Sequence, residues 1–301
     1  GIIDTFRDLN YGLPLAFGGY PRFLLPKYKA ALERFEGMFS NPQFMQNSSD
    51  LLKIYYNLDA TWNARMKTAI MVLWGSNANS TPGVFWLLYY ILKDRKAYES
   101  IRREVDRVLG STPDPDAPLS VSQVDELHET QSAFKEACRM QFAAFTVFDL
   151  EDDFVVQPKM KERKKSGKPS KFLLQKGTRI MGYVGVHHDD GAIFENPRQF
   201  QWKRFAPDEN GEPPQFFDRN GRRLLSPTYE FGAGTHLCPG RRFIRYIACS
   251  YVAKLISQFD IRLTEKEMSL PQPDIDRELI GLGLTTPARE VFMEVRPRTK
   301  N

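Results

Sequence analysis

A ten-residue segment, FGAGTHLCPG at 231–240, constrains the fold more than any other part of the sequence. It places Cys238 among glycines immediately before a predicted helix over about 241–259. The backbone N–H groups and the dipole at the start of a helix favour a thiolate over a thiol. The segment therefore predicts a loop that holds an anionic sulfur in place.

The small residues of this Cys loop, 231–240, explain how a backbone can fold around the sulfur. Glycine adopts conformations that side chains exclude and lets a flat ligand approach the backbone closely. Proline fixes the turn into the helix, and a phenylalanine can shield one side of the sulfur from water. The residues concerned are Phe231, Gly232, Gly234, Pro239 and Gly240. The alternative is a glycine-rich turn that holds a buried, inert cysteine.

Composition limits the class of protein. Cys138, Cys238 and Cys249 form no C-x-x-C pair and leave an odd count, which suits a reducing compartment and offers neither a disulfide framework nor a zinc site. A net charge of +5 on 301 residues is compatible with an acidic protein or an anionic membrane, but it gives no nucleic-acid signature. No run of eighteen apolar residues occurs. The chain begins at Gly1 without a leader, so we expect the start of the natural protein to be missing.

The apolar periodicity predicts a mainly helical chain with small β-sheets, an α+β fold in one domain over 1–301. The long apolar segment 61–92 predicts one helix, which Gly75 and Pro82 should bend. Further helices are predicted at about 27–39, 95–110, 130–141 and 241–259, with Ser120 or Ser122 as the cap of a short one.

Strands are predicted at DFVVQP, KFLLQ and TRIMGYVGV, and GLGLTTP and EVFMEVRP predict a terminal hairpin. A basic tip between the first two strands is most simply a solvated loop; it contains Lys161, Arg163, Lys164 and Lys165. The chain from His187 to Tyr229 is irregular, and so long a structureless stretch tends to be functional.

The Cys loop resembles the heme-binding loop of the cytochrome P450 family, F-x-x-G-x-[R/H]-x-C-x-G, matched by Phe231, Gly234, His236, Cys238 and Gly240. The resemblance implies that Cys238 is the axial thiolate ligand of heme iron and that His236 binds a heme propionate. It also implies the cytochrome P450 fold, with the N-terminal part missing.

Two further motifs are similar to those of this family. Glu136 and Arg139, three apart on a predicted helix, match E-x-x-R, and FENPRQFQWKRF resembles the segment that supplies a third member, Arg204. The resemblance implies a charged triad that joins the helix to a meander over about 197–230 and supports the Cys loop. An ordinary surface ion pair is the alternative for Glu136 and Arg139.

The polar interlude GSNANSTP falls where the family keeps an oxygen-activating A-G-x-[D/E]-T motif. Ala78 takes the place of the usual acid and Asn79 that of the usual threonine, a variation similar to the sterol 7α-hydroxylase, sterol 12α-hydroxylase and prostacyclin synthase subgroup. Both residues are therefore expected to be catalytic. A kinked core helix whose hydroxyls bond back to the preceding turn is the alternative.

The resemblance also predicts a substrate pocket of apolar and small residues, suited to a sterol, terpenoid or fatty acyl compound. Three segments should converge over the iron: the helix near Ala78 and Asn79, the chain after the E-x-x-R helix, and the terminal hairpin tip. The predicted lining is Pro82, Ala143, Ala144, Phe145, Thr146, Val147, Leu282, Gly283, Leu284, Thr285 and Thr286. Phe148 lies where members of the family commonly carry a propionate-binding arginine.

By resemblance, the leading function is a monooxygenase that receives NADPH-derived electrons from a cytochrome P450 reductase. The resemblance implies the cytosolic face of the endoplasmic reticulum membrane, with an anchor preceding Gly1. A reductase contact and simple solvation are equal alternatives for Arg241, Arg242 and Arg245. An isomerase or dehydratase of peroxides, and an inactive fragment, are the other candidate functions.

The adjacent pair His187 and His188, followed by Asp189 and Asp190, favours a structural turn over a metal site. Adjacent side chains point in different directions, and the family carries a similar turn without a metal.

Overall fold

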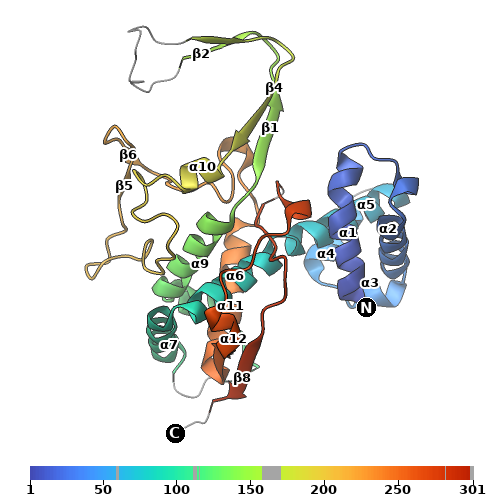
Figure 1. Ribbon diagram of the computed structural model, residues 1–301. Helices are drawn as coiled ribbons and strands as arrows, with labels where there is room; N and C mark the ends of the chain where they lie inside the picture. The colour runs from blue at the N-terminus through green and yellow to red at the C-terminus, as the bar shows by residue number, and fades with distance from the viewer. Residues whose placement is uncertain (59–60, 111–113, 115, 158–170, 282, 299–301) are drawn as a thin grey trace.

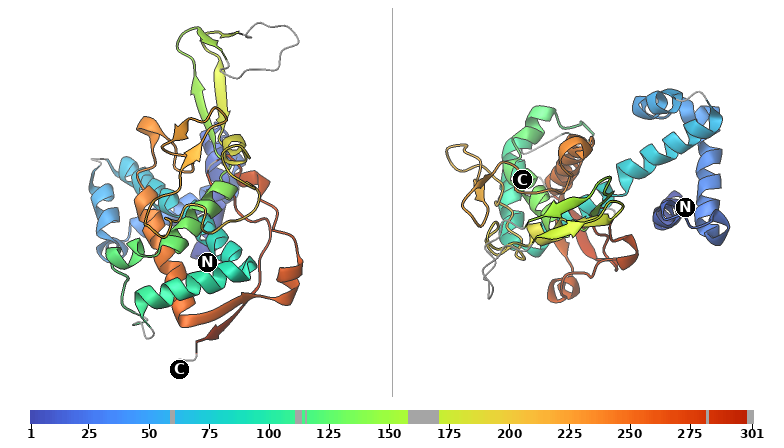
Figure 2. Two further views of the ribbon diagram at one scale, coloured as in Figure 1. Left: turned by 90° about the vertical axis from the view of Figure 1, so that its left-hand side faces the viewer. Right: turned by 90° about the horizontal axis from the view of Figure 1, so that it is seen from above.

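The computed structural model describes residues 1–58, 61–110, 114, 116–157, 171–281 and 283–298. It is mainly helical with small antiparallel sheets, which confirms the predicted α+β class. Figure 1 shows an N-terminal group of helices beside a larger body, and the view from above in Figure 2 shows α5 as the connection.

The N-terminal group packs around its own small core. Its elements are α1 (Ile2–Phe17), η1 (Arg22–Leu24), α2 (Pro26–Phe39), α3 (Pro42–Gln46), α4 (Asp50–Leu58) and α5 (Trp62–Asn77). Leu9, Phe35 and Ala69, from α1, α2 and α5, are buried together. At Gly12 a Cβ atom would lie 2.3 Å from Cβ of Tyr28, so this glycine lets α1 and α2 approach closely.

The larger body is built around α6 (Ser80–Lys93), which is buried along most of its length. Its helices α7, α8, α9 and α11 are Arg95–Leu109, Val121–Asp125, His128–Gln141 and Arg241–Gln258. Trp86, Phe134 and Val252, from α6, α9 and α11, belong to one apolar cluster. Because nearly every face of α6 is apolar, only a central position buries it fully.

Within the described residues the four sheets are each two-stranded and antiparallel. β1 (Phe145–Asp149) pairs with β4 (Arg179–Tyr183), and β2 (Phe154–Val156) pairs with β3 (Phe172–Leu174). These two sheets form a projecting arm (Figure 1). The other pairs are β5 (Phe216–Phe217) with β6 (Arg223–Leu224) and β7 (Phe259–Leu263) with β8 (Met293–Pro297). Short helices complete the fold: α10 (Gly185–His188), η2 (Gly234–His236), α12 (Glu265–Ser269) and η3 (Arg277–Leu279).

The predicted single helix over 61–92 is wrong: it is two helices, α5 and α6, separated at Ala78 and Asn79. Gly75 lies inside α5, and Pro82 lies in the first turn of α6, where a missing N–H costs nothing. Just before the break, the Ser76 hydroxyl and the Asn77 amide donate to the carbonyl groups of Val72 and Leu73. Such side-chain bonds compete with continued helix.

The predicted terminal hairpin is also wrong. β8 pairs with β7 rather than with the 281–286 segment, which instead runs beside the chain that leaves α9. The amide of Ala143 donates to the Gly283 carbonyl and that of Gly281 to the Ala143 carbonyl, both at 2.9 Å. The two segments of the predicted hairpin are close in sequence, which favoured their pairing. In the structure Gly281 and Leu284 instead pair with the chain after α9.

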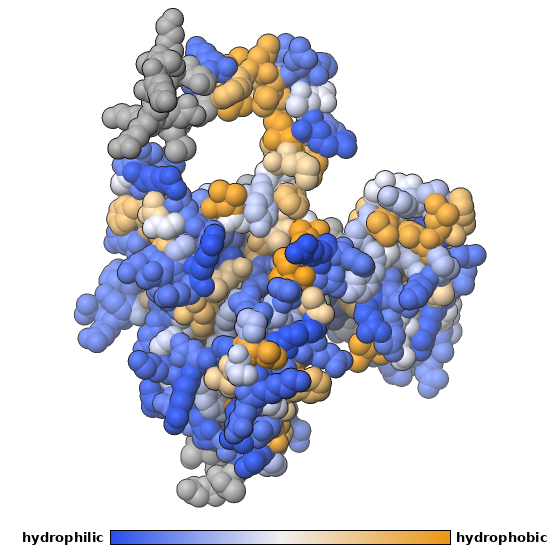
Figure 3. Space-filling model, viewed as in Figure 1, coloured by the Kyte–Doolittle hydropathy of each residue, from blue (hydrophilic) through white to orange (hydrophobic). Residues whose placement is uncertain are grey.

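Apolar side chains gather on the arm, as the orange surface at the top of Figure 3 shows. Exposed members include Val147, Phe154, Leu173 and Met181. None of the helices in the described ranges has the length and apolar character needed to cross a membrane. The basic tip with Lys161, Arg163, Lys164 and Lys165 lies outside the described residues.

Candidate functional site

The Cys loop is closed by its own backbone. The amide of Cys238 donates to the carbonyl of Phe231 at 2.8 Å, across a single turn of 3-10 helix at 234–236. Gly232 and Gly234 have φ of 77° and 60°, which explains why the sequence has glycine there. Gly240 differs, because its φ of −78° suits any residue and an added Cβ would make an ordinary contact, 3.8 Å from Sγ of Cys238. The predicted steric need for glycine therefore applies to the first two positions.

Cys238 differs from the other two cysteines in exposure. Cys138 and Cys249 are buried, and burial raises the pKa of both thiols, that of Cys249 to about 12. Both thiols are therefore neutral and unsuited to bind iron. Cys238 is partly exposed and leads directly into α11. A thiolate-bound cofactor therefore fits Cys238.

The other predicted cofactor residues flank the sulfur loop. Phe231 packs against the main apolar cluster. Arg241 donates from its guanidinium to the Cys238 carbonyl at 3.1 Å, a contact that the sequence did not reveal. The side chain of His236 lies outside what the structure describes, so its bond to a propionate stays a prediction.

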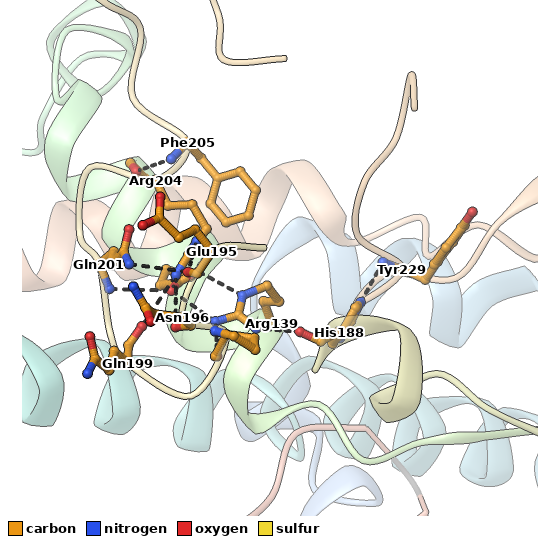
Figure 4. Close-up of polar contacts among 12 residues, drawn as sticks. Arg139, His188, Glu195, Asn196, Gln199, Gln201, Arg204, Phe205 and Tyr229 are labelled. Carbon is orange, nitrogen blue, oxygen red and sulfur yellow. Dashed lines mark hydrogen bonds and ion pairs between the residues drawn. The ribbon is translucent and has the colours of Figure 1, made fainter. Parts of the chain in front are cut away.

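Glu136, Arg139 and Arg204 lie together in the interior, as Figure 4 shows around Arg139 and Arg204. The Arg139 guanidinium donates to both carboxylate oxygens of Glu136, at 2.8 and 2.9 Å, and Arg204 Nε donates to Oε1 at 2.9 Å. Glu136 is fully buried and Arg139 is 2% exposed, which excludes the alternative of a surface pair. The three charges join α9 to the meander.

A hydrogen-bonded path connects this cluster to the Cys loop, and Figure 4 shows it from Arg139 through His188 to Tyr229. Arg139 donates to the His188 carbonyl at 2.5 Å, and His188 Nε2 accepts from the Tyr229 amide at 2.9 Å. The Tyr229 carbonyl in turn accepts from the Gly232 amide at 2.9 Å. The sequence singled out both ends of this path and suggested a structural turn at His188, but nothing in it indicated that His188 connects them.

His188 is held as a neutral imidazole. Burial lowers its pKa to about 3, and nearby cationic groups add to the effect. The flanking carboxylates pair with arginines: Asp189 with Arg198 at 2.7 Å and Asp190 with Arg219 at 3.0 Å. Within the described residues, no group of three or more His, Cys, Asp or Glu could hold a metal ion. The two ion pairs and the bond to Tyr229 give the turn around His188 a structural role.

Asn79 lies at the break between α5 and α6 and contacts a distant segment. Its Oδ1 accepts from the Leu284 amide at 2.8 Å, and a Cβ on Gly283 would lie 2.0 Å from that oxygen. Nearby, Trp86 Nε1 donates to the Thr285 carbonyl at 2.6 Å. The start of α6 and the 283–285 segment are therefore locked together. Ala78 ends α5 beside this contact.

The structure brings together part of the predicted substrate pocket. Ala143, which is buried, pairs with Gly283, and Pro82 is buried at the start of α6. Ala144 forms a bridge with Gly281. Phe145, Thr146 and Val147 lie exposed on β1, in the arm, and their place in the pocket lining stays a prediction. Thr286 is half-buried at the end of this segment, and Leu282 lies outside the described residues.

Comparison with known proteins gives the family. The chain is 30% identical over 256 residues to cytochrome P450 7B1 of Mus musculus. This match covers 83% of this chain and 46% of that protein. It is 25% identical over 302 residues to cholesterol 7-alpha-monooxygenase of Cricetulus griseus, covering 96% of this chain and 58% of that protein. The chain is 25% identical over 236 residues to prostacyclin synthase of Bos taurus, a match that covers 77% of this chain and 45% of that protein.

The chain thus spans about half the length of the curated relatives it matches. The family model of cytochrome P450 matches residues 45–291, a range that contains the buried charge cluster, the meander and the Cys loop. The resemblance read from these motifs is confirmed. This chain belongs to the cytochrome P450 family.

Proposed function

We propose that this protein is a heme-thiolate monooxygenase that inserts one oxygen atom of O2 into an apolar substrate. The observation that carries the proposal is the contrast among the three cysteines. Cys138 and Cys249 are buried thiols, whereas Cys238 is partly exposed in a backbone-closed loop at the start of α11.

Cys238 is the proposed ligand of heme iron, flanked by Phe231, Gly232, Gly234 and His236. When bound, thiolate-ligated heme supplies dioxygen activation, and the thiolate promotes O–O cleavage. Cys238 lies two residues before Gly240, the N-cap of α11. At Gly234 an added Cβ would meet nothing within 4 Å, so this face of the loop is open to a flat ligand.

The buried charges position this loop. Glu136 fixes Arg139 and Arg204, and the path through His188 and Tyr229 connects Arg139 to the amide of Gly232. The path runs by hydrogen bonds from the buried Arg139 and His188 to the exposed Gly232. The position of the loop therefore depends on the cluster.

Ala78 and Asn79 are the proposed catalytic residues at the substrate side. Asn79 Oδ1 accepts from Leu284. Only the hydrogens of Nδ2 can donate to a reacting oxygen, because an amide oxygen is solely an acceptor. We propose that it donates to an oxygen atom or orients the water that delivers a proton, in place of the acid and hydroxyl that the family usually has.

The proposed substrate is a sterol, a terpenoid or a fatty acyl compound. Relatives named cholesterol 7-alpha-monooxygenase and 25-hydroxycholesterol 7-alpha-hydroxylase support the sterol class. NADPH–cytochrome P450 reductase is the proposed electron donor, meeting the cationic start of α11 at Arg241, Arg242 and Arg245. The proposed place of work is the endoplasmic reticulum membrane, as the resemblance to the family implies.

A second candidate function is isomerisation of a peroxide substrate without external electrons. The similarity to prostacyclin synthase and the presence of Ala78 and Asn79 favour it. The experiment that separates the two is turnover of the full-length enzyme with and without NADPH and reductase. Hydroxylated product that requires both supports the monooxygenase; product from an endoperoxide without them supports the isomerase, and neither product indicates an inactive protein.

A further inference from the structure

A large cleft lies beside the Cys loop, between α9, the meander and the first turns of α11. Its volume is about 820 Å3, within the usual range of small-molecule sites, roughly 300–1,000 Å3. Apolar side chains form much of one wall, among them Phe205, Pro213, Phe216 and Leu224. This wall suits the apolar body of a ligand.

Cationic side chains also line the cleft. Arg241, Arg242 and Arg245 line it from α11, and Lys135 lines it from α9, with Nζ 4.6 Å from the centroid of the Phe205 ring. The first turn of α11 contains no acidic residue, so the positive end of the helix dipole adds to these charges. Asp125 and Glu230 supply counter-charges, and the carboxylate of Asp125 lies 3.9 Å from Arg245. The side-chain charges around the cleft are therefore positive in excess.

Two polar atoms at this cleft lack protein partners. Nε of Arg245 and Oε2 of Glu230 are each buried without a hydrogen bond, although both residues line the cleft. Buried polar groups in folded proteins nearly always have a partner. Burial raises the pKa of the Glu230 carboxyl, which favours the neutral acid that can donate a hydrogen bond to an anion.

We propose that this cleft binds a small amphipathic anion, an apolar body with a carboxylate or phosphate head. The head would lie against Arg242 and Arg245 and the body against the Phe216 wall. This site is separate from the substrate segments near Asn79. It shares Arg242 and Arg245 with the face proposed above for the reductase, so its test measures anion binding alone, without heme or turnover.

The test is isothermal titration calorimetry of the purified chain with laurate, lauryl phosphate, 1-dodecanol and inorganic phosphate. We expect laurate or lauryl phosphate to bind at least tenfold more tightly than 1-dodecanol, which has the same chain without charge. The preference between the two anions identifies the head group. Inorganic phosphate, which lacks the apolar body, should bind more weakly than either.

Matched variants locate the site. Arg245→Gln should weaken binding of the preferred anion at least tenfold, and Arg242→Gln should weaken it less. Arg296→Gln removes an equal charge from a side chain that is 75% exposed on β8, and it should leave binding unchanged. If Arg245→Gln does not fold, protection of Arg242 and Arg245 from phenylglyoxal by the anion replaces it.

Equal binding of laurate and 1-dodecanol would overturn the proposal. An affinity unchanged by Arg242→Gln and Arg245→Gln, or phenylglyoxal labelling of Arg242 and Arg245 that the anion does not reduce, would overturn it as well. Loss of heme binding or of turnover would not, because those readouts test Cys238 and the proposed function.

Discussion

Asn79 Oδ1 accepts a hydrogen bond from the backbone amide of Leu284, 205 positions later, at 2.8 Å. This contact links the break between α5 and α6 to the segment that runs beside the chain after α9. A residue that the sequence suggested only as catalytic thus also has a structural role. The two roles can be separated by experiment.

Asn79→Leu should lower the free energy of unfolding by about 1–3 kcal/mol, because the Leu284 amide loses its acceptor inside the protein. Asn79→Asp, which keeps an acceptor oxygen, should cost less. Urea unfolding measures both. In the full-length enzyme with reductase, Asn79→Leu should also divert NADPH consumption toward peroxide; tight coupling in this variant would contradict the catalytic role.

Glu136→Ala should lower the free energy of unfolding by about 3–5 kcal/mol, because Arg139 would remain buried without its counter-charge. The matched control is Glu99→Ala, which removes a carboxylate whose side chain is 48% exposed beside Arg95 and should cost under about 0.5 kcal/mol. Chemical denaturation of both variants provides the comparison. Similar small losses in the two would show that the charge cluster is dispensable.

Cys238→Ala should abolish the thiolate-type absorbance of the reduced carbon monoxide complex in the full-length enzyme, because no other described cysteine can supply an anionic sulfur. Cys249→Ala should retain that spectrum and lose only stability, since it leaves a small cavity in the core. A spectrum that survives Cys238→Ala would contradict the assignment of the iron ligand.

His188 should make folding sensitive to acid. Its pKa is about 3 in the folded protein and 6.5 for the ordinary group, so the unfolded chain binds the proton more tightly. Stability from this residue is complete above pH 6.5 and falls toward pH 3, by up to about 1.4 kcal/mol per pH unit. His188→Gln should remove that slope, whereas the exposed His128→Gln should leave it. Parallel pH profiles for wild type and His188→Gln would refute the prediction.

Gly283→Ala should destabilise the protein, by roughly 1–3 kcal/mol or more, because φ is 143° and the new Cβ would collide with Asn79 Oδ1. Gly75→Ala offers the opposite case. This exposed glycine lies inside α5 with open space around it, so alanine should stabilise by about 0.5–1 kcal/mol. Thermal melts of the two variants should shift in opposite directions.

The sequence alone determined the features that depend on local chemistry. Glycine, proline and cysteine at fixed spacing predicted the closed Cys loop, and positive φ at Gly232 and Gly234 gives the reason. The i,i+3 spacing of Glu136 and Arg139 placed two charges on one helix face. These predictions held because each depends on neighbours within a few residues.

Only the tertiary structure decided the features that depend on distant partners. Nothing near Asn79 in the chain identifies Leu284 as its partner, and nothing near His188 indicates that its ring accepts from Tyr229. The 281–285 segment pairs with the chain after α9 rather than with β8. Unpaired backbone groups form hydrogen bonds with whichever segment the packing places beside them. Local propensity carries no information about which distant edge that is.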